Sequence, residues 1–151
     1  MMITHEYKNR LIQFCIDNLE IKSSELQTEI DEVMKATNEY GPPKDRYDGF
    51  KNQQMRKIEM LTAQIHLVHD DIRVFMQIDK LHPSDSVKLG ALFTTSDQII
   101  MVACSIGKIE FEGLSLFILS PKVPFYDAVK GAKKGTAVKF RDKVININEL
   151  T

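Results

Sequence analysis

Two carboxylates three residues apart, Asp45 and Asp48, are the side chains of this 151-residue chain best suited to chemistry. They follow the break Gly41-Pro42-Pro43, which no helix can pass through. If a helix begins near Lys44, both acids lie on one face of its first turn, where the helix dipole stabilises anions. The structural interpretation is that they simply fill a favourable helix start.

The functional interpretation is a shared metal site. Carboxylate oxygens suit Mg²⁺, but two of them fall short of its octahedral shell, so a partner must supply the other ligands. In that role Asp45 and Asp48 would help to hold a second Mg²⁺ and orient a water for phosphodiester cleavage. The neighbouring basic side chains are expected to contact the partner by charge. They are Lys44, Arg46 and Arg56.

Other chemical candidates are weaker. His66 and His69 have a metal-compatible spacing, but no third ligand is evident and two surface histidines are the better explanation. There is no GxSxG nucleophile elbow and no glycine-rich phosphate loop. Cys15 and Cys104 stand in apolar contexts, which predicts buried free thiols rather than a disulfide.

The first eighty residues have a heptad pattern that predicts two helices. In the first half, two series with a seven-residue repeat interlock: Leu19, Leu26, Val33, Tyr40 and Ile16, Ser23, Ile30, Thr37. In the second half, apolar residues follow alternating steps of four and three: Ile58, Leu61, Ile65, Val68, Ile72, Phe75. The short Gly-Pro-Pro break between them predicts an antiparallel coiled-coil hairpin. Thr4 is the expected N-cap.

The chain changes character at Lys80–Asp85, which predicts one domain over 1–80 and a second over 81–151. The second domain has short runs rich in β-branched residues, with one helix at Phe125–Lys130 stopped by Gly131. The expected strands are Val87–Thr94, Gln98–Cys104, Leu114–Leu119, Thr136–Phe140 and Val144–Ile147, the last two joined by a tight turn. The predicted fold class is α+β.

Charge and hydropathy exclude some functions. The net charge of −1 predicts no strong bulk attraction to nucleic acid or to an anionic membrane. No run approaches the ~18 apolar residues of a membrane span, and the N-terminus lacks the apolar core of a signal peptide. We therefore expect a cytoplasmic protein with no membrane partner and no sequence-specific DNA binding.

Two stretches resemble the bacterial transcript cleavage factors of the GreA/GreB family. The segment Leu116–Ser120, followed by Pro124-x-x-x-Ala128-x-x-Gly131-x-x-x-Gly135, is similar to the family's C-terminal motif. The segment Asp45-Arg46-Tyr47-Asp48 resembles the family's acidic hairpin tip, with Asp48 where the family has Glu. The junction Ile78-Asp79 with Pro83 is also similar.

The resemblance implies a fold and a function. The second domain would be FKBP-like and sit on RNA polymerase at its secondary channel, with Tyr47, Ser120 and Pro124 among the contacts. The hairpin would enter the channel, where Asp45 and Asp48 help the polymerase to hold Mg²⁺ and cleave the 3′ end of backtracked RNA. The chain would be a monomeric accessory factor with no cofactor of its own.

Several alternatives remain open at this point. The Asp48 side chain is one methylene shorter than Glu and reaches about 1 Å less far, which leaves a channel-binding regulator or inhibitor without cleavage activity as one alternative. An FKBP-like domain also suits a prolyl isomerase or chaperone, although the aromatic residues available for its cup are few: Phe93, Phe111, Phe117, Phe125 and Tyr126. The regular second heptad series also fits a coiled-coil oligomerisation module.

Overall fold

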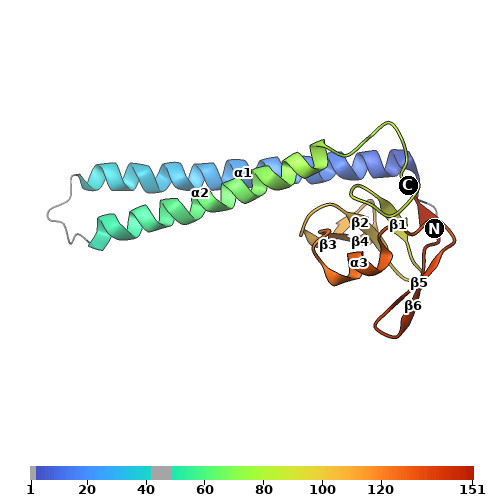
Figure 1. Cartoon of the computed structure of the whole chain (residues 1–151). Coiled ribbons are helices and arrows are strands. Elements are labelled where there is room, and N and C mark those ends of the chain that lie inside the picture. The colour runs from blue at the N-terminus through green and yellow to red at the C-terminus, as the bar shows by residue number, and fades with distance from the viewer. Residues whose placement is uncertain (1–2, 42–48) are drawn as a thin grey trace. The chain divides into compact units, whose positions relative to one another are not determined.

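A computed structural model of the chain describes residues 3–41 and 49–151. The described chain forms two compact units, one of Ile16–Arg73 and one of the chain up to Cys15 together with Val74–Thr151. We call them the helical unit and the β unit. Two long helices, α1 (His5–Tyr40) and α2 (Gly49–Met76), precede the strands, which confirms a mixed α+β protein (Figure 1).

The helical unit is an antiparallel pair. Three cross-helix contacts show the direction, because the residue number falls on α2 as it rises on α1. The Ser23 hydroxyl lies 2.9 Å from His69 Nε2, Lys51 Nζ donates to the Thr37 carbonyl oxygen at 3.2 Å, and the rings of Tyr40 and Phe50 are 4.4 Å apart.

The heptad pattern gives the buried seam of this pair. Eight apolar side chains in the unit's seam are buried: Ile16, Leu19, Leu26, Ile30 and Val33 on α1, and Leu61, Ile65 and Val68 on α2. The polar seam positions have hydrogen-bond partners: Ser23 meets His69 across the pair, and the Thr37 hydroxyl donates to the Val33 carbonyl at 2.7 Å. The predicted pairing of two helices is confirmed.

The β unit is built on a five-stranded sheet in the order β3-β4-β2-β1-β7. Its strands are β1 (Leu92–Thr94), β2 (Ile99–Val102), β3 (Gly107–Phe111), β4 (Leu114–Leu119) and β7 (Glu149–Leu150). Only β2 and β4 are parallel among these neighbours, because the β3–β4 hairpin reverses the chain before β4 joins β2. The remaining elements are α3 (Pro124–Val129) and a separate hairpin of β5 (Ala137–Phe140) and β6 (Lys143–Asn146).

Both faces of this sheet are covered in part. Phe93 and Ile100 are opposite each other in the register and belong to a core with Val129 of α3 and Ile147. On the other face, the register brings together Leu92, Met101 and Ile118, which are all buried. Burial on both faces explains why β1 and β2 are apolar at every position rather than alternating.

The start of α1 belongs to the β unit and contacts the β3–β4 turn. The Phe111 ring lies 5.5 Å from Tyr7 and 4.7 Å from Phe14. Arg10 donates two hydrogen bonds to the Glu112 carboxylate, at 3.1 and 3.2 Å. Thr4 caps the helix as expected, since its hydroxyl accepts the Tyr7 amide at 3.0 Å.

The strand predictions were right in part. β4, β5 and β6 lie within or beside the expected runs, and α3 ends one residue before Lys130, with Gly131 following at φ 79°. Residues 87–91 are not a strand: Gly90 has φ 90°, and a Cβ there would lie 2.8 Å from Ile78 Cγ2. β3 and β7 were missed, because β3 is largely polar and β7 has two residues.

Candidate functional site

The acidic pair predicted from the sequence lies outside the described residues. Asp45 and Asp48, with Lys44, Arg46 and Tyr47, fall in the segment 42–48. The structure describes the residues on either side of that segment. α1 ends at Tyr40, Gly41 follows with φ 92°, and the described part of α2 starts at Gly49.

The two helix ends next to this segment are held together. Tyr40 and Phe50 pack with tilted rings 4.4 Å apart, and the Lys51 ammonium donates to the Thr37 carbonyl. That bond satisfies one of the carbonyl groups that a helix C-terminus leaves without an intrahelical partner. A positively charged donor there also complements the negative end of the α1 dipole. The helix pair therefore stays closed up to the edge of the segment that contains Asp45 and Asp48.

Arg56 is exposed on α2, two turns after its described start. Lys51 and Lys57 lie on the same stretch of α2, where Glu59 is the nearest acid in sequence. Arg56 and Lys57 are thus exposed basic side chains on α2, and the contact of Arg56 with a partner stays a prediction.

Ser120 and Pro124 flank the loop between β4 and α3, with Pro124 as the first residue of the helix. The Ser120 hydroxyl accepts the Lys122 amide at 3.1 Å, and its carbonyl accepts the Val123 amide at 3.2 Å. Pro124 is the first residue of α3, where its missing N–H costs nothing, and its side chain is exposed. The loop is thus a defined turn that leads to the exposed Pro124.

An apolar pocket of about 210 Å³ opens near this loop. Phe117 and Phe125 line it together with Ile100 and Leu119, and the Phe117 side chain is 37% exposed. The other three aromatic residues considered for an FKBP-like substrate cup do not line this pocket. Phe93 is fully buried in the core, Phe111 packs on the start of α1, and Tyr126 packs against the core.

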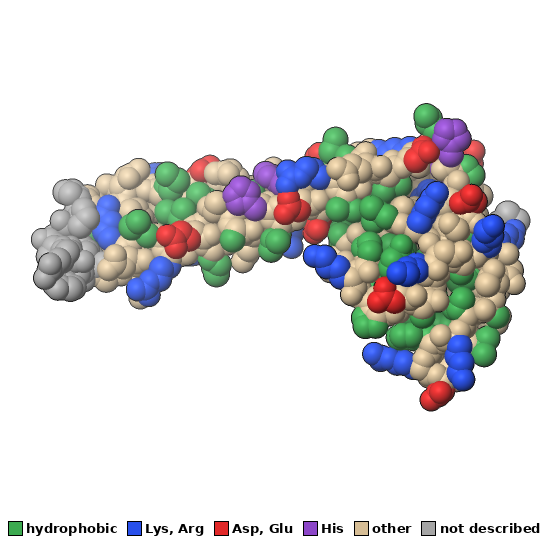
Figure 2. All heavy atoms as spheres, in the orientation of Figure 1, with side chains coloured by type: hydrophobic (Ala, Val, Ile, Leu, Met, Phe, Trp, Pro, Cys, Tyr) green, Lys and Arg blue, Asp and Glu red, His purple; other side chains and the backbone are tan. Residues whose placement is uncertain are grey.

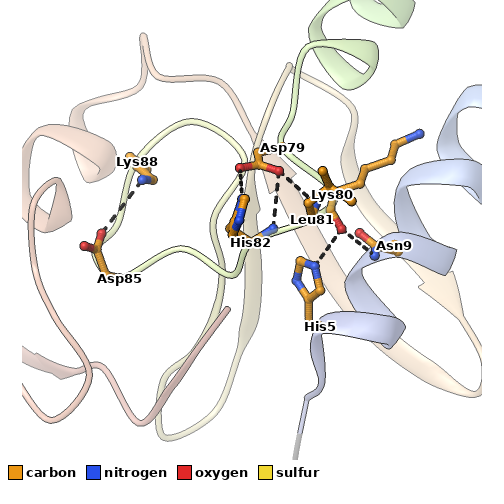
Figure 3. Close-up of polar contacts among 8 residues, drawn as sticks. All are labelled: His5, Asn9, Asp79, Lys80, Leu81, His82, Asp85 and Lys88. Carbon is orange, nitrogen blue, oxygen red and sulfur yellow. Dashed lines mark hydrogen bonds and ion pairs between the residues drawn. The ribbon is translucent and has the colours of Figure 1, made fainter.

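A polar junction joins the start of α1 to the segment after α2 within the β unit (Figure 3). The Lys80 carbonyl oxygen accepts from His5 Nε2 at 2.7 Å and from Asn9 Nδ2 at 3.0 Å. A carbonyl can only accept, so this contact requires the proton on Nε2 of His5. Beside it, Asp79 accepts the Leu81 amide at 2.8 Å and pairs with His82 Nδ1 at 3.0 Å.

Two pKa values at this junction are displaced. The Leu81 amide first, and then His82, hold the pKa of Asp79 below its usual value. Lys8 is 1% exposed, and this burial lowers its pKa from 10.5 to about 8, although the nearby Asp79 carboxylate works in the opposite direction. Sequence reasoning missed Lys8, because nothing in its neighbourhood predicts that an ammonium group would be buried.

The remaining chemical candidates take structural roles. His69 meets Ser23 across the helix pair, and no cluster of three His, Cys, Asp or Glu side chains that could hold a metal ion occurs within residues 3–41 and 49–151. Cys15 and Cys104 are both free and buried, as predicted. Burial raises the pKa of the Cys15 thiol to about 12, which leaves it unreactive near neutral pH.

Comparisons with protein-family models, curated proteins and solved structures find no match to this chain. In the part of the chain that is described, no helix combines the length and apolar character needed to cross a membrane.

Proposed function

We propose that this chain is a secondary-channel factor of RNA polymerase, similar to the GreA/GreB family, that stimulates cleavage of backtracked RNA. The observation that carries the proposal is the closed antiparallel helix pair whose connection contains Asp45 and Asp48. In the helical unit each helix contributes 25 residues, Ile16–Tyr40 and Gly49–Arg73, or roughly 38 Å at ~1.5 Å per residue. A pair of this length can carry an acidic connection deep into a partner.

The chain acts in this proposal as an accessory, not as the enzyme. Asp45 and Asp48 supply hard oxygen ligands that fit Mg²⁺, while polymerase and water supply the rest of its shell. The metal, when bound, neutralises charge on the phosphodiester and activates a water. The two carboxylates position that water, and the factor touches the RNA 3′ end only indirectly. It needs no cofactor of its own.

The β unit holds the factor at the channel entrance in the proposal. We assign it an FKBP-like fold, supported by a mixed sheet with α3 against one face and by the Pro124–Gly135 motif. Ser120 and Pro124 would contact the polymerase, since their loop is ordered by its own hydrogen bonds and leaves Pro124 exposed. Lys44, Arg46, Tyr47 and Arg56 would contact the channel wall. The protein would be cytoplasmic.

The test uses purified backtracked elongation complexes of the polymerase from the same organism, with Mg²⁺. The full chain is expected to shorten the RNA from its 3′ end, and the double variant Asp45→Asn/Asp48→Asn to lose this activity. A matched control is Glu29→Gln/Glu32→Gln. These two acids are exposed on α1 with the same spacing, and their replacement removes the same number of negative charges. The control should cleave like the parent protein.

Three results would separate the alternatives. Equal cleavage by both double variants would refute the role of the acidic pair. Competition for the channel without any cleavage would support a non-cleaving regulator, in which Asp48 is too short for the chemistry. Neither cleavage nor competition would sink the polymerase proposal altogether.

A further inference from the structure

The last part of the chain is basic, although the chain as a whole is not. Residues 121–151 contain seven basic and three acidic side chains, a net charge of +4, whereas residues 1–120 contain thirteen and eighteen, a net charge of −5. Lys134 pairs with Glu149 at 3.5 Å. The other six are exposed and form no ion pair with a carboxylate of the described residues: Lys122, Lys130, Lys133, Lys139, Arg141 and Lys143. We call these six the basic hairpin surface.

An anchored β-hairpin carries three of the six, Lys139, Arg141 and Lys143. The β5–β6 turn has two residues with φ 48° and 63°, the primed geometry that continues the twist of both strands. Val138 and Ile145 face each other and pack against the core, while Phe140 meets Phe125 edge-on at 5.4 Å. The three charges on the hairpin are therefore held on a fixed ribbon. Figure 2 shows basic side chains on both flanks of this hairpin, with a single acidic group near its turn.

The composition of the surface favours phosphate over protein as its partner. Five of its six members are lysines, and lysine is depleted in the cores of protein–protein interfaces. Lysine and arginine are the groups that replace counterions along a nucleic-acid backbone. We propose that the basic hairpin surface binds the phosphate backbone of duplex DNA, without reading its sequence.

The shape of the hairpin favours a B-form duplex over single strands or RNA. A two-stranded ribbon fits a major groove about 12 Å wide, whereas the major groove of A-form RNA is closed to side chains. Single strands are usually held by stacking on exposed aromatic rings. Phe140 is not available for that, because it is half-buried against Phe125 and Arg141 lies 5.0 Å above its ring.

The outer face of the ribbon can lie against the groove. Lys139 and Val144 are directly opposite each other in the register, next to Ala137 and Asn146, and these four side chains are exposed. Val144 is 67% exposed, so it has no partner to cover it in the β unit. A lysine, an amide and small apolar groups can touch groove walls of any sequence.

The test measures binding of the full chain to a short labelled B-form duplex, without polymerase, by fluorescence anisotropy. At low salt the dissociation constant is expected on the order of 10⁻⁵ M, and its logarithm should change by about 3 per tenfold change in salt, as three or four phosphate contacts require. The triple variant Lys139→Gln/Arg141→Gln/Lys143→Gln should bind at least about tenfold more weakly. The control Lys22→Gln/Lys35→Gln/Lys108→Gln removes the same charge from exposed positions elsewhere and should bind like the parent.

The inference does not rest on the polymerase proposal, because this assay contains no polymerase. No binding by the parent at low salt would overturn it, as would equal loss in both triple variants. Tighter binding to single-stranded DNA, to RNA or to an acidic peptide would also overturn it in favour of that partner. Unchanged melting temperatures of both variants would show that the binding loss is not a folding defect.

Discussion

Lys8 is a charged group in a position where the fold otherwise places hydrocarbon. Its side chain is 1% exposed, and burial lowers its pKa from 10.5 to about 8. Between these values the unfolded chain holds a proton that the folded chain has lost, so the free energy of unfolding must rise with pH across this window. Below pH 8 both the folded and the unfolded state carry the proton, so the full cost of burying the Lys8 charge lowers the free energy of unfolding.

The replacement Lys8→Met should therefore stabilise the protein at pH 7, by about 1–3 kcal/mol, because it keeps the packing and removes the charge. The advantage over the parent protein should shrink as pH rises from 8 towards 10. Urea denaturation of both proteins at several pH values measures it. The exposed Lys22→Met is the control and should show no such trend. A constant difference across this range would contradict the assigned pKa.

For Asp48 the question is the length of the side chain, because in the proposed function its carboxylate must reach the Mg²⁺ site in the polymerase. Under the proposed function, Asp48→Glu restores the residue that the GreA/GreB family has there and adds about 1 Å of reach. Misplacement on that scale can cost about a hundredfold in rate, so we expect cleavage to rise at least about tenfold. Rates of 3′ shortening at saturating factor provide the measurement. Asp31→Glu makes the same change on the exposed surface of α1 and should have no effect; a slower Asp48→Glu protein would argue against a reach-limited role.

At the level of elements, the helical unit depends on its heptad seam. Leu61 is 3% exposed within it, while its neighbour Met60 is 54% exposed. Leu61→Ala should lower the free energy of unfolding by about 2–5 kcal/mol, because it leaves a cavity between the helices. Met60→Ala should change it by less than about 0.5 kcal/mol. Chemical denaturation followed by circular dichroism compares the two, and equal losses would mean that the seam is wrongly assigned.

The same elements show how much of the fold the sequence could predict. The helices were predictable because an apolar period repeated over many turns leaves one arrangement that buries it. β3 was missed because Lys108 and Glu110 occupy its exposed positions and dilute the apolar signal. The strand expected at residues 87–91 is replaced by turns, since Gly90 adopts a positive φ against Ile78. Contacts such as Phe111 with Tyr7 join residues more than a hundred positions apart, and no local pattern encodes them.

The candidate sites follow the same division. Asp45 and Asp48 were found from residue type and spacing, and they stay a prediction because they lie outside the described residues. The burial of Lys8 depends on tertiary packing and could not be read locally. The basic hairpin surface had a signal in the sequence, the +4 charge of residues 121–151, which the balanced charge of the whole chain conceals.

For the whole molecule, the main question is whether the helix seam is closed within one chain or between two. The pairs Ser23–His69, Thr37–Lys51 and Tyr40–Phe50 all form within a single chain, and the seam side chains are buried there without a second copy. A dimer would have to exchange these contacts for equivalent ones and would lose entropy on association. We therefore expect a monomer.

Sedimentation velocity should give a mass near 17.3 kDa, and the melting temperature should not change over a hundredfold range of protein concentration. Leu61→Ala should lower the melting temperature without making it depend on concentration, because the seam it damages is intramolecular. A stable dimer whose melting temperature rises with concentration would favour the coiled-coil oligomerisation module. Such a result would also weaken the polymerase proposal, since a seam shared between two chains would no longer present one acidic connection at the end of one closed pair.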